Sequence, residues 1–362
     1  MSAPERHGDE DLARIRLRRS AASAPSGGSD RQGAWGPRVS VVVPTYQRPA
    51  LLRRCLRALL QQTIGPWAFE IIVVDDGRQD AVRALVREMA ALPGAPALRY
   101  LRPHGRGPAG ARNLGWRAAR APIIAFTDDD TIAHPDWLAQ GEAALRARPH
   151  WSALAGRVMV PLEGGPTRRP SDHERMTQGL QRAEFVTANA FVRRAALALV
   201  GGFDERFLRA WREDADLQFR LMQQAGPVGR CDDARVLHPA RPERWGVCLR
   251  QQRNTYFDAL LYKKHPRLYR ERIRRVPPWD YYVIVGATVA AIVLALLGAP
   301  LAAASAGTAA AALVLRLAWQ RLRPTRHDAA HVLEMLATSA LIPYLSVYWR
   351  TRGALHFRVL FL

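Results

Sequence analysis

The sequence has few cysteines, and they lack the spacing typical of metal or redox sites. The three cysteines among 362 residues, Cys55, Cys231 and Cys248, stand far apart and are odd in number. No C-x-x-C pattern joins any two of them, so they give no support to a cysteine metal centre or a redox pair. We therefore expect reduced thiols in a cytosolic domain.

The N-terminal segment lacks the apolar core of a signal peptide, and we expect no export of this domain. Residues 1–37 are rich in Arg, Ser, Gly, Pro and acidic side chains. Such a composition cannot bury enough apolar surface to fold alone. We expect this segment to be a disordered tail.

Acidic residues are fewer than basic residues. The chain has 32 Asp and Glu against 53 Lys and Arg, which gives a formal net charge of +21. This balance favours phosphate-rich partners or an anionic membrane surface. A nucleic-acid partner is not expected, because zinc-finger spacing, an RNP-like aromatic signature and a basic region with heptads are all missing.

Short apolar runs alternate with helical periods between residues 39 and 160. The runs at 39–43, 71–74 and 123–126 indicate strands, and the helical period after the first run has leucines on one face and arginines opposite. This alternation predicts an α/β domain with a mostly parallel sheet covered by helices on both faces. Ligands of such sheets lie outside the carboxyl ends of the strands.

Polar side chains follow each of these apolar runs. Pro44-Thr45-Tyr46 follows the first, Asp75-Asp76-Gly77 the second and Asp128-Asp129-Asp130 the third. Three consecutive carboxylates repel one another unless a cation neutralises them. Mg²⁺ and Mn²⁺ bind both carboxylate and phosphate oxygens, so the same site could hold a diphosphate. The alternative is a solvated acidic turn or a helix N-cap.

A glycine pattern precedes the third run. Residues 105–110 match G-x-G-x-x-G after a plausible strand, which would suit a nicotinamide or flavin oxidoreductase. However, the match lies in a later strand–helix unit than usual, and Pro108 interrupts it. The other interpretation is a flexible loop into a helix that carries Arg112 and Asn113, which could reach a nucleotide diphosphate.

Two further candidates lie later in the chain. Glu213 and Asp214 begin a helical run, where the helix dipole favours acidic groups. Capping would explain one of them, and a positioned carboxylate could equally act as a general base. His238 follows an apolar run and could complete a metal site, although a lone histidine is more often structural.

The longest charge-free stretch runs from residue 281 to 315 and is interrupted by Gly298-Ala299-Pro300. One helix of that length would measure roughly 50 Å, more than the ~30 Å hydrocarbon core. We expect a transmembrane hairpin over residues 280–318; the alternative is a buried soluble hairpin. Basic residues flank both ends, which places the catalytic domain on the cytosolic side of the inner membrane. Residues 330–362 should form a third membrane or interfacial helix and a basic tail.

Several of these segments, in this order, resemble the family 2 glycosyltransferases of the GT-A fold. The resemblance covers roughly residues 38–270 and implies a Rossmann-like mixed sheet, with a nucleotide-binding part at 38–130 and an acceptor part at 131–270. The segments that carry it are Val39–Arg48, Ile71–Gly77, Gly110–Asn113, Asp128–Asp130, Gly201–Asp204 and Glu213-Asp214.

The resemblance also implies roles for individual residues. The implied contacts to the donor nucleotide come from Pro44, Thr45, Tyr46, Arg48, Asp75, Asp76, Arg112, Asp128 and Asp129. The implied ligands of a divalent metal, Mn²⁺ or Mg²⁺, are Asp130, Asp128 and His238. The implied catalytic base is Asp214 with Glu213 beside it, and Asn189 and Trp211 would lie near the acceptor or the donor sugar.

The implied reaction is an inverting transfer of one sugar from a nucleotide-diphospho-sugar to a hydroxyl of a lipid-linked or cell-surface glycan acceptor. The Q-x-x-R-W signature of processive synthases is missing, because residues 251–254 have no Trp in place. Arg78 stands where the family commonly has Ser. The other hypotheses are transfer onto a polyprenyl phosphate, a sugar-1-phosphate nucleotidyltransferase and a non-enzymatic membrane scaffold. The sequence does not indicate an oligomeric state.

Overall fold

The structure is a computed structural model that describes residues 36–103, 107–165 and 167–362. The expected tail therefore lies outside the described residues up to position 35. The first two residues of the glycine pattern, Gly105 and Arg106, also lie outside them.

Four parallel strands form the first half of an eight-stranded sheet. In the order β3-β2-β1-β4 they pair in parallel throughout. Their bounds are β1 (Val39–Thr45), β2 (Phe69–Asp75), β3 (Ala97–Leu101) and β4 (Ile123–Phe126). Strands buried on both faces need a nearly continuous apolar sequence, which the runs in β1, β2 and β4 provide.

Helices cover both faces of this half, as the alternating pattern predicts. Val41 and Val43 of β1 pack into one core cluster, and the intervening Val42 packs into another on the opposite face. The first cluster includes residues of α2 and α3, and the second includes residues of α4. The helices are α2 (Pro49–Leu59), α3 (Asp80–Ala90), α4 (Pro108–Ala118) and α5 (Trp137–Arg146), with the short η1 (Pro66–Ala68) before β2.

The second half of the sheet is mixed and continues in the order β4-β7-β6-β8-β5. β7 runs antiparallel to both of its neighbours, because residues 160–189 leave β6 and enter β7 at the same edge of the sheet. The mixed sheet of the GT-A fold is therefore confirmed, whereas a mostly parallel sheet describes only its first half. The strands are β5 (Ile132–Ala133), β6 (Ala153–Met159), β7 (Ala190–Arg193) and β8 (Val228–Leu237).

Several helices lie between these strands and after them in the sequence. Before β7 come α6 (Asp172–Gln178), η2 (Gly179–Arg182) and η3 (Thr187–Asn189), and after it come α7 (Arg194–Val200) and α8 (Glu213–Gln224). After β8 come α9 (Val247–Gln251), η4 (Gln252–Thr255), α10 (Tyr256–Lys264), α11 (Pro266–Leu268) and η5 (Tyr269–Ile273). We call residues 36–273, apart from positions 104–106 and 166, the α/β domain.

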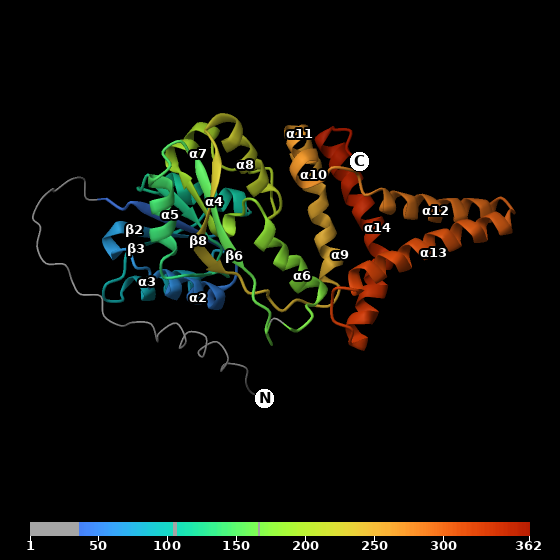
Figure 1. Ribbon diagram of the computed structural model, residues 1–362, viewed down its shortest axis with the longest axis horizontal. Coiled ribbons are helices and arrows are strands. Elements are labelled where there is room, and N and C mark those ends of the chain that lie inside the picture. The colour runs from blue at the N-terminus through green and yellow to red at the C-terminus, as the bar shows by residue number, and fades with distance from the viewer. Residues whose placement is uncertain (1–35, 104–106, 166) are drawn as a thin grey trace, which may run out of the picture. The chain divides into compact units, whose positions relative to one another are not determined.

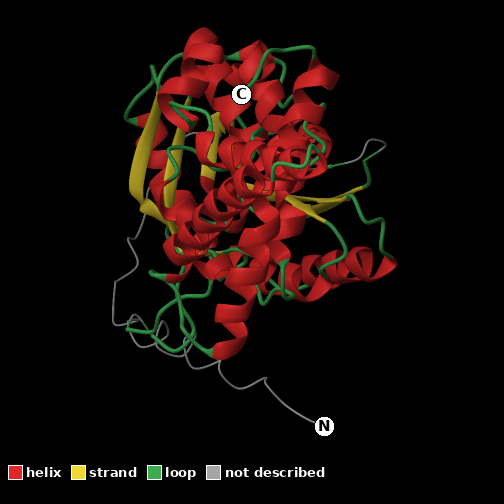
Figure 2. Ribbon diagram, turned by 90° about the vertical axis from the view of Figure 1, so that its right-hand side faces the viewer, coloured by secondary structure: helices red, strands yellow, loops and turns green. Residues whose placement is uncertain are grey.

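Three helices at the C-terminal end are long and apolar enough to cross a membrane, by length and composition. They are α12 (Trp279–Leu296), α13 (Pro300–Leu322) and α14 (Ala329–Phe357). α12 and α13 form a hairpin that projects away from the α/β domain, with α14 between the two (Figure 1). Figure 2, viewed from that side, shows these helices in front of the strands. The candidate membrane helices are thus confirmed.

The surface of the hairpin argues against the buried soluble alternative. Leu296, Leu297 and Leu301 are 82%, 75% and 85% exposed. In contrast, the end of α14 shares a core cluster with the α/β domain, because Ala354 and Phe357 pack with Phe257 of α10. The two parts of the C-terminal region therefore have different surroundings.

Candidate active site

The polar segments after β1, β2 and β4 meet at one edge of the sheet. Thr45, the last residue of β1, lies beside Asp75, the last residue of β2. Thr127 follows β4, and its N–H donates to the carbonyl of Val42 in β1. This convergence follows from parallel pairing, since the carboxyl ends of parallel strands share one edge.

The acidic triplet, Asp128, Asp129 and Asp130, is attached to β1 by its central member. The hydroxyl of Thr45 donates to Asp129 Oδ2 at 2.7 Å, and Arg48 lies 3.4 Å from Asp129 Oδ1. Burial raises the pKa of Asp129 to about 6. Asp129 thus points inward, and its two neighbours are the members that can face a ligand.

The other two carboxylates of the triplet lie beside His238. One ligand atom from each of Asp128, Asp130 and His238 lies within 4.8 Å of the others. The pairing of β5 with β8 places Ile132 opposite Leu237, and this register brings Asp130 and His238 together across about 100 residues of sequence. His238 Nε2 lies 3.4 Å from Asp130 Oδ1.

This group suits a divalent cation by its chemistry. Two carboxylates and one imidazole nitrogen are donors that Mn²⁺ accepts, and carboxylates alone also suit Mg²⁺. His238 is 8% exposed, and its Nδ1 is buried without a hydrogen-bond partner among the described residues. Asp130 is paired with Arg241, whose Nε lies 3.1 Å from Oδ2. An ion here would therefore share Asp130 with a guanidinium or displace it.

Arg112 connects the triplet to the acidic pair, Glu213 and Asp214. This side chain of α4 is 2% exposed. One terminal nitrogen donates to Asp128 Oδ1 at 2.8 Å and the other donates to Glu213 Oε1 at 3.0 Å. A single fixed cation thus lies between two carboxylate groups that are far apart in the sequence.

The two members of the pair differ in exposure. Glu213 is 2% exposed, and its Oε2 is buried without a hydrogen-bond partner among the described residues. Burial, together with the nearby Asp214, raises the pKa of Glu213 to about 8. Asp214 is only partly buried; burial also raises its pKa, while the N–H of Ala215 donates to its Oδ1 at 2.7 Å. Asp214 is therefore the member that an incoming group can reach.

The residues just before the pair are held by Asp258 of α10. Its buried carboxylate accepts hydrogen bonds from Arg212 Nε at 2.7 Å and Trp211 Nε1 at 3.1 Å. A third contact comes from Arg350 of α14 at 3.2 Å. Arg212 has a φ of 75°, a left-handed conformation that is unusual for a residue other than glycine. These contacts hold the loop that precedes α8 in place.

The sequence analysis missed Asp258. The signal that could have found it is a single acidic residue inside the otherwise apolar start of α10, Tyr256–Leu261. A carboxylate at a buried position needs cationic or hydrogen-bonding partners. The identity of those partners could not be read from the sequence, because Arg212 and Arg350 lie 46 and 92 residues away.

Asp75 and Asp76 organise the loops at this edge. The buried carboxylate of Asp75 accepts hydrogen bonds from the N–H groups of Gly77 and Gln79, at 3.0 and 2.7 Å, and from the Tyr100 hydroxyl at 2.9 Å. Asp76 Oδ2 accepts the N–H of Gly107 at 2.8 Å. Asp75 is thus fully engaged within the protein, whereas Asp76 remains partly exposed.

Gly107 requires the conformation that only glycine adopts readily. Its φ is 91°, and a Cβ at this position would approach the carbonyl oxygen of Leu208 to 2.8 Å. The described end of the glycine pattern therefore has a packing role, in addition to the contact of Gly107 with Asp76.

Three other expected site residues have different placements. Tyr46 is 53% exposed at the edge where the strands end, next to the partly buried Pro44. Asn189 is fully buried; its carbonyl accepts Trp137 Nε1, and its amide donates to the carbonyls of Arg157 and Ala234. All these hydrogen bonds are internal, and a role of the Asn189 side chain at the acceptor or the donor sugar stays a prediction.

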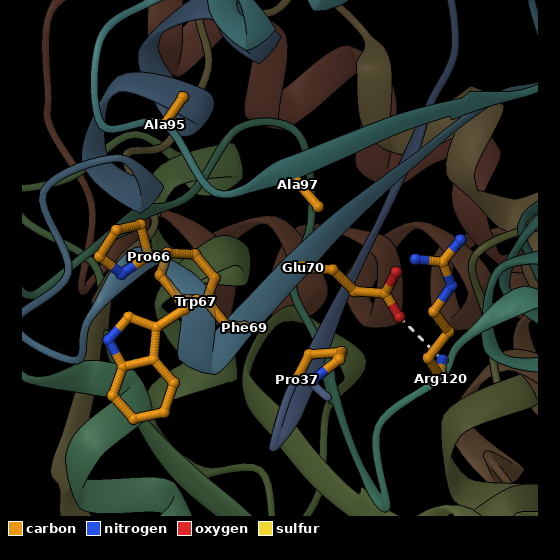
Figure 3. Close-up of a pocket in the computed structure, with 8 residues that line it drawn as sticks. All are labelled: Pro37, Pro66, Trp67, Phe69, Glu70, Ala95, Ala97 and Arg120. Atoms are coloured by element: carbon orange, nitrogen blue, oxygen red, sulfur yellow. Dashed lines mark hydrogen bonds between the residues drawn. The ribbon is translucent and has the colours of Figure 1, made fainter. Parts of the chain in front are cut away.

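A separate hollow lies at the opposite edge of the sheet, where β1 and β2 begin (Figure 3). Its only acidic lining residue, Glu70, accepts hydrogen bonds from the Arg120 N–H and the Ser40 hydroxyl, both at 2.7 Å. The remaining lining includes Pro66, Trp67 and Phe69. The hollow has no contact with the acidic triplet or the acidic pair.

The sequence matches one family over nearly half of its length. Residues 40–207 match the family described as Glycosyl transferase family 2. The chain is 32% identical over 230 residues to validoxylamine A glucosyltransferase of Streptomyces hygroscopicus subsp. limoneus, covering 53% of this chain and 49% of that protein. It is 27% identical over 221 residues to glycosyltransferase AglE of Haloferax volcanii, covering 60% of this chain and 71% of AglE. The chain thus spans about half the length of the first relative.

A solved structure has a similar fold. The mannosyltransferase PcManGT from Pyrobaculum calidifontis, in complex with GDP-Man and Mn²⁺, matches with a TM-score of 0.54 and 21% sequence identity. The match covers 87% of this chain and 88% of that one. At this identity the likeness concerns the fold, and it agrees with the GT-A type of sheet described above.

Proposed function

Because the chain carries a glycosyltransferase family 2 domain, we propose that it is an inverting, metal-dependent and non-processive glycosyltransferase. It would move one sugar from a nucleotide-diphospho-sugar to a hydroxyl of a lipid-linked or cell-surface glycan acceptor. The observation that carries the proposal is the position of Arg112, hydrogen-bonded to the acidic triplet on one side and to the acidic pair on the other. A binding group and a candidate base are thereby held next to each other.

The donor nucleotide would bind at the edge where β1, β2 and β4 end, in the part formed by residues 38–130. Tyr46 and Asp76 keep exposed surface there, and Arg48 is partly exposed beside Asp129. Asp75 would act by holding the loop after β2 in place, since its carboxylate is already engaged. The remaining proposed contacts come from Pro44, Arg112 and Asp128, and Thr45 and Asp129 would contribute through the hydrogen bond that holds the triplet against β1.

Asp128, Asp130 and His238 would hold Mn²⁺ or Mg²⁺. When bound, such an ion supplies positive charge that offsets the negative charge of the donor diphosphate. The protein supplies a second cation nearby, because the Arg112 guanidinium is fixed 2.8 Å from Asp128. Fixed positive charge next to a leaving diphosphate stabilises the charge that develops on it.

Asp214 would take the proton from the attacking hydroxyl. It is the more exposed member of the acidic pair. Glu213 would be mostly protonated near neutral pH, since burial raises its pKa to about 8. Two like charges side by side are thereby avoided, and one negative charge remains available on Asp214. Trp211, whose indole is tied to Asp258, would flank the acceptor.

The acceptor is proposed to lie at the membrane, because three apolar helices adjoin the α/β domain. Basic residues on both sides of the hairpin favour a location at the inner membrane, with the α/β domain in the cytosol. Transfer onto a polyprenyl phosphate is the second candidate, because a phosphate oxygen at the membrane needs no strong base. No substrate of the relatives is assigned to this chain.

The donor site can be tested by thermal stabilisation of the detergent-solubilised protein with UDP-, GDP- and dTDP-sugars, with and without Mn²⁺. We expect one nucleotide to raise the melting temperature only when the metal is present, and Asp130→Ala to abolish this shift. The matched control is Asp232→Ala, which removes a carboxylate with a 64% exposed side chain on β8 and should keep the shift. If no nucleotide shifts the wild-type protein, the transferase proposal loses its main support.

A further inference from the structure

The α/β domain contacts α14 along most of the helix. Near its start, Glu334 Oε1 accepts the N–H of Gly246 at 2.8 Å. Arg350 pairs with Asp258, and the carbonyl of Phe357 at its end accepts Lys263 Nζ at 2.7 Å. These contacts extend over about 35 Å of helix at ~1.5 Å per residue. A helix that crossed the bilayer at this position would carry a charged, water-soluble domain into the hydrocarbon core, which is strongly unfavourable.

From Leu341 onward, the side of α14 that points away from Arg350 is apolar and exposed; Glu334, seven residues before Leu341 and so on the same side, instead bonds to Gly246. Leu341, Tyr348 and Leu355 are 50%, 54% and 74% exposed, and they recur at intervals of seven residues. Side chains at that spacing lie on one side of a helix. Near the end of the same helix Arg352 stacks on Trp349, with its guanidinium carbon 5.1 Å from the ring centroid. Trp349 itself lies near Tyr256 and Arg253 of the α/β domain, so it is the exposed apolar side alone that is typical of a helix in the membrane interface.

The hairpin continues outward from this exposed side. Figure 1 shows α12 and α13 projecting from α14 on the side away from the α/β domain, at a steep angle to α14. The hydroxyls of Thr288 in α12 and Tyr344 in α14 are 2.7 Å apart, which marks where α12 passes α14. Beyond Thr288, α12 has eight more residues, or about 12 Å. That is less than half of the ~30 Å hydrocarbon core.

The tip of the hairpin is apolar as well. Leu296, Leu297 and Leu301 are among the most exposed apolar side chains in the described residues, and no charged residue occurs from position 281 to 315. A tip that emerged on the far side of the bilayer would expose the apolar surface of these leucines to water, which is unfavourable. Within the acyl chains their exposure carries no such penalty.

From these observations we propose that the chain is anchored from one side of the membrane. α14 lies along the membrane surface between the α/β domain and the lipid, and the hairpin of α12 and α13 enters the bilayer without crossing it. Three membrane crossings would place both the hairpin tip and the C-terminus on the far side of the membrane. In the proposed arrangement the tip lies within the bilayer and the C-terminus stays on the side of the α/β domain. This inference concerns anchoring alone and does not rest on the proposed transferase activity.

The proposal can be tested by cysteine labelling of the full chain in membrane vesicles of both orientations, with a maleimide that does not cross membranes. Cys231, the partly exposed native thiol, is first replaced by Ser; Cys55 and Cys248 are buried. We expect Leu362→Cys to be labelled only in vesicles that expose the cytosolic side, like the surface control Asp232→Cys. We expect Leu297→Cys to be labelled in neither orientation until detergent is added.

Labelling of Leu362→Cys from the far side would show that α14 crosses the membrane, and labelling of Leu297→Cys from the far side would show that the hairpin does. Labelling of Leu297→Cys from the cytosolic side would show that the hairpin is not inserted. Each of these results overturns the proposal. A nitroxide spin label at position 297 gives a positive readout of insertion. In a tip that is buried in lipid, the nitroxide should collide more often with dissolved oxygen than with a water-soluble nickel complex.

Discussion

The acidic triplet and the acidic pair contain the same kind of side chain in different surroundings. In the triplet, Asp128 keeps 28% of its side chain exposed, and Asp130 lies between His238 and Arg241. In the pair, Glu213 is almost fully buried, and Arg112 is its only cationic partner among the described residues. The triplet thus has several positive groups around it, whereas Glu213 lies deep in the domain next to one.

This difference shows how one site can separate binding from proton transfer. Carboxylates that lie beside cationic groups can hold a metal ion or a charged ligand. Burial next to another carboxylate instead raises the pKa of Glu213 to about 8, and Asp214 is the partly exposed member that we propose as the base. Arg112 bonds to both clusters and keeps them in a fixed relation.

The largest expected effect separates the two clusters directly. If Asp214 is the base for a hydroxyl acceptor, Asp214→Asn should lower turnover by about 10²- to 10⁴-fold, the range for loss of a general base. Metal-dependent stabilisation by the donor should remain, because the triplet is intact. The measurements are kcat with a membrane-borne acceptor and the thermal shift described above.

Asp130→Ala gives the complementary result: the thermal shift should be lost before any acceptor is added. Near-normal turnover of Asp214→Asn would contradict a base at this position and favour a phosphate acceptor. Loss of the donor shift in Asp214→Asn would show instead that the two clusters cannot be separated as proposed.

The first half of the site could be predicted from the sequence because its signals are local. The apolar runs mark strands that end at Thr45, Asp75 and Phe126, and parallel pairing alone then brings the following residues to one edge. The association of Asp130 with His238 depends on the pairing of β5 with β8, which no local pattern specifies. Its prediction required the family resemblance.

The environments of Asn189 and of α14 depend on contacts that the sequence does not specify. The motif around Asn189 indicates its place in the chain, but the burial of its amide depends on β6, β7 and β8 packing around it. The sequence predicts a third membrane or interfacial helix and a basic tail over residues 330–362, and the helix runs over Ala329–Phe357. Its polar residues Glu334 and Arg350 face the α/β domain, and that contact could not be known before the fold.

A smaller effect is expected at Asp258, which we propose as a positioning residue for the pair. Asp258→Asn should lower kcat by about tenfold while changing the KM for the donor little, because a small displacement of a catalytic group is costly. Arg212 and Arg350 would lose the charge that they share. The matched variant Arg350→Lys keeps the charge and should retain more activity than Arg350→Gln.

A merely structural role for Asp258 would lower the melting temperature and the amount of active enzyme without altering the kcat of the enzyme that remains folded. Active-site titration with the donor therefore has to accompany the kinetics. A parallel rise in the KM for the donor would place the effect at the triplet instead, and would contradict the division between the clusters.

The smallest expected effect concerns the pH dependence of stability. Glu213 has a pKa of about 8 in the folded protein against 4.5 for the unperturbed side chain, so the folded state binds more protons than the unfolded state between these values. Stability contributed by this group is therefore present at low pH and is lost as the pH rises from 4.5 to 8. Glu213→Gln cannot titrate, so its melting temperature should fall less across that window, by roughly a few degrees. The control Glu163→Gln, at an exposed carboxylate, should follow the wild type. Equal slopes of melting temperature against pH for wild type and Glu213→Gln would mean that Glu213 is ionised in the folded protein. The pair would then carry two negative charges, and Asp214 would no longer differ from Glu213 as the candidate base.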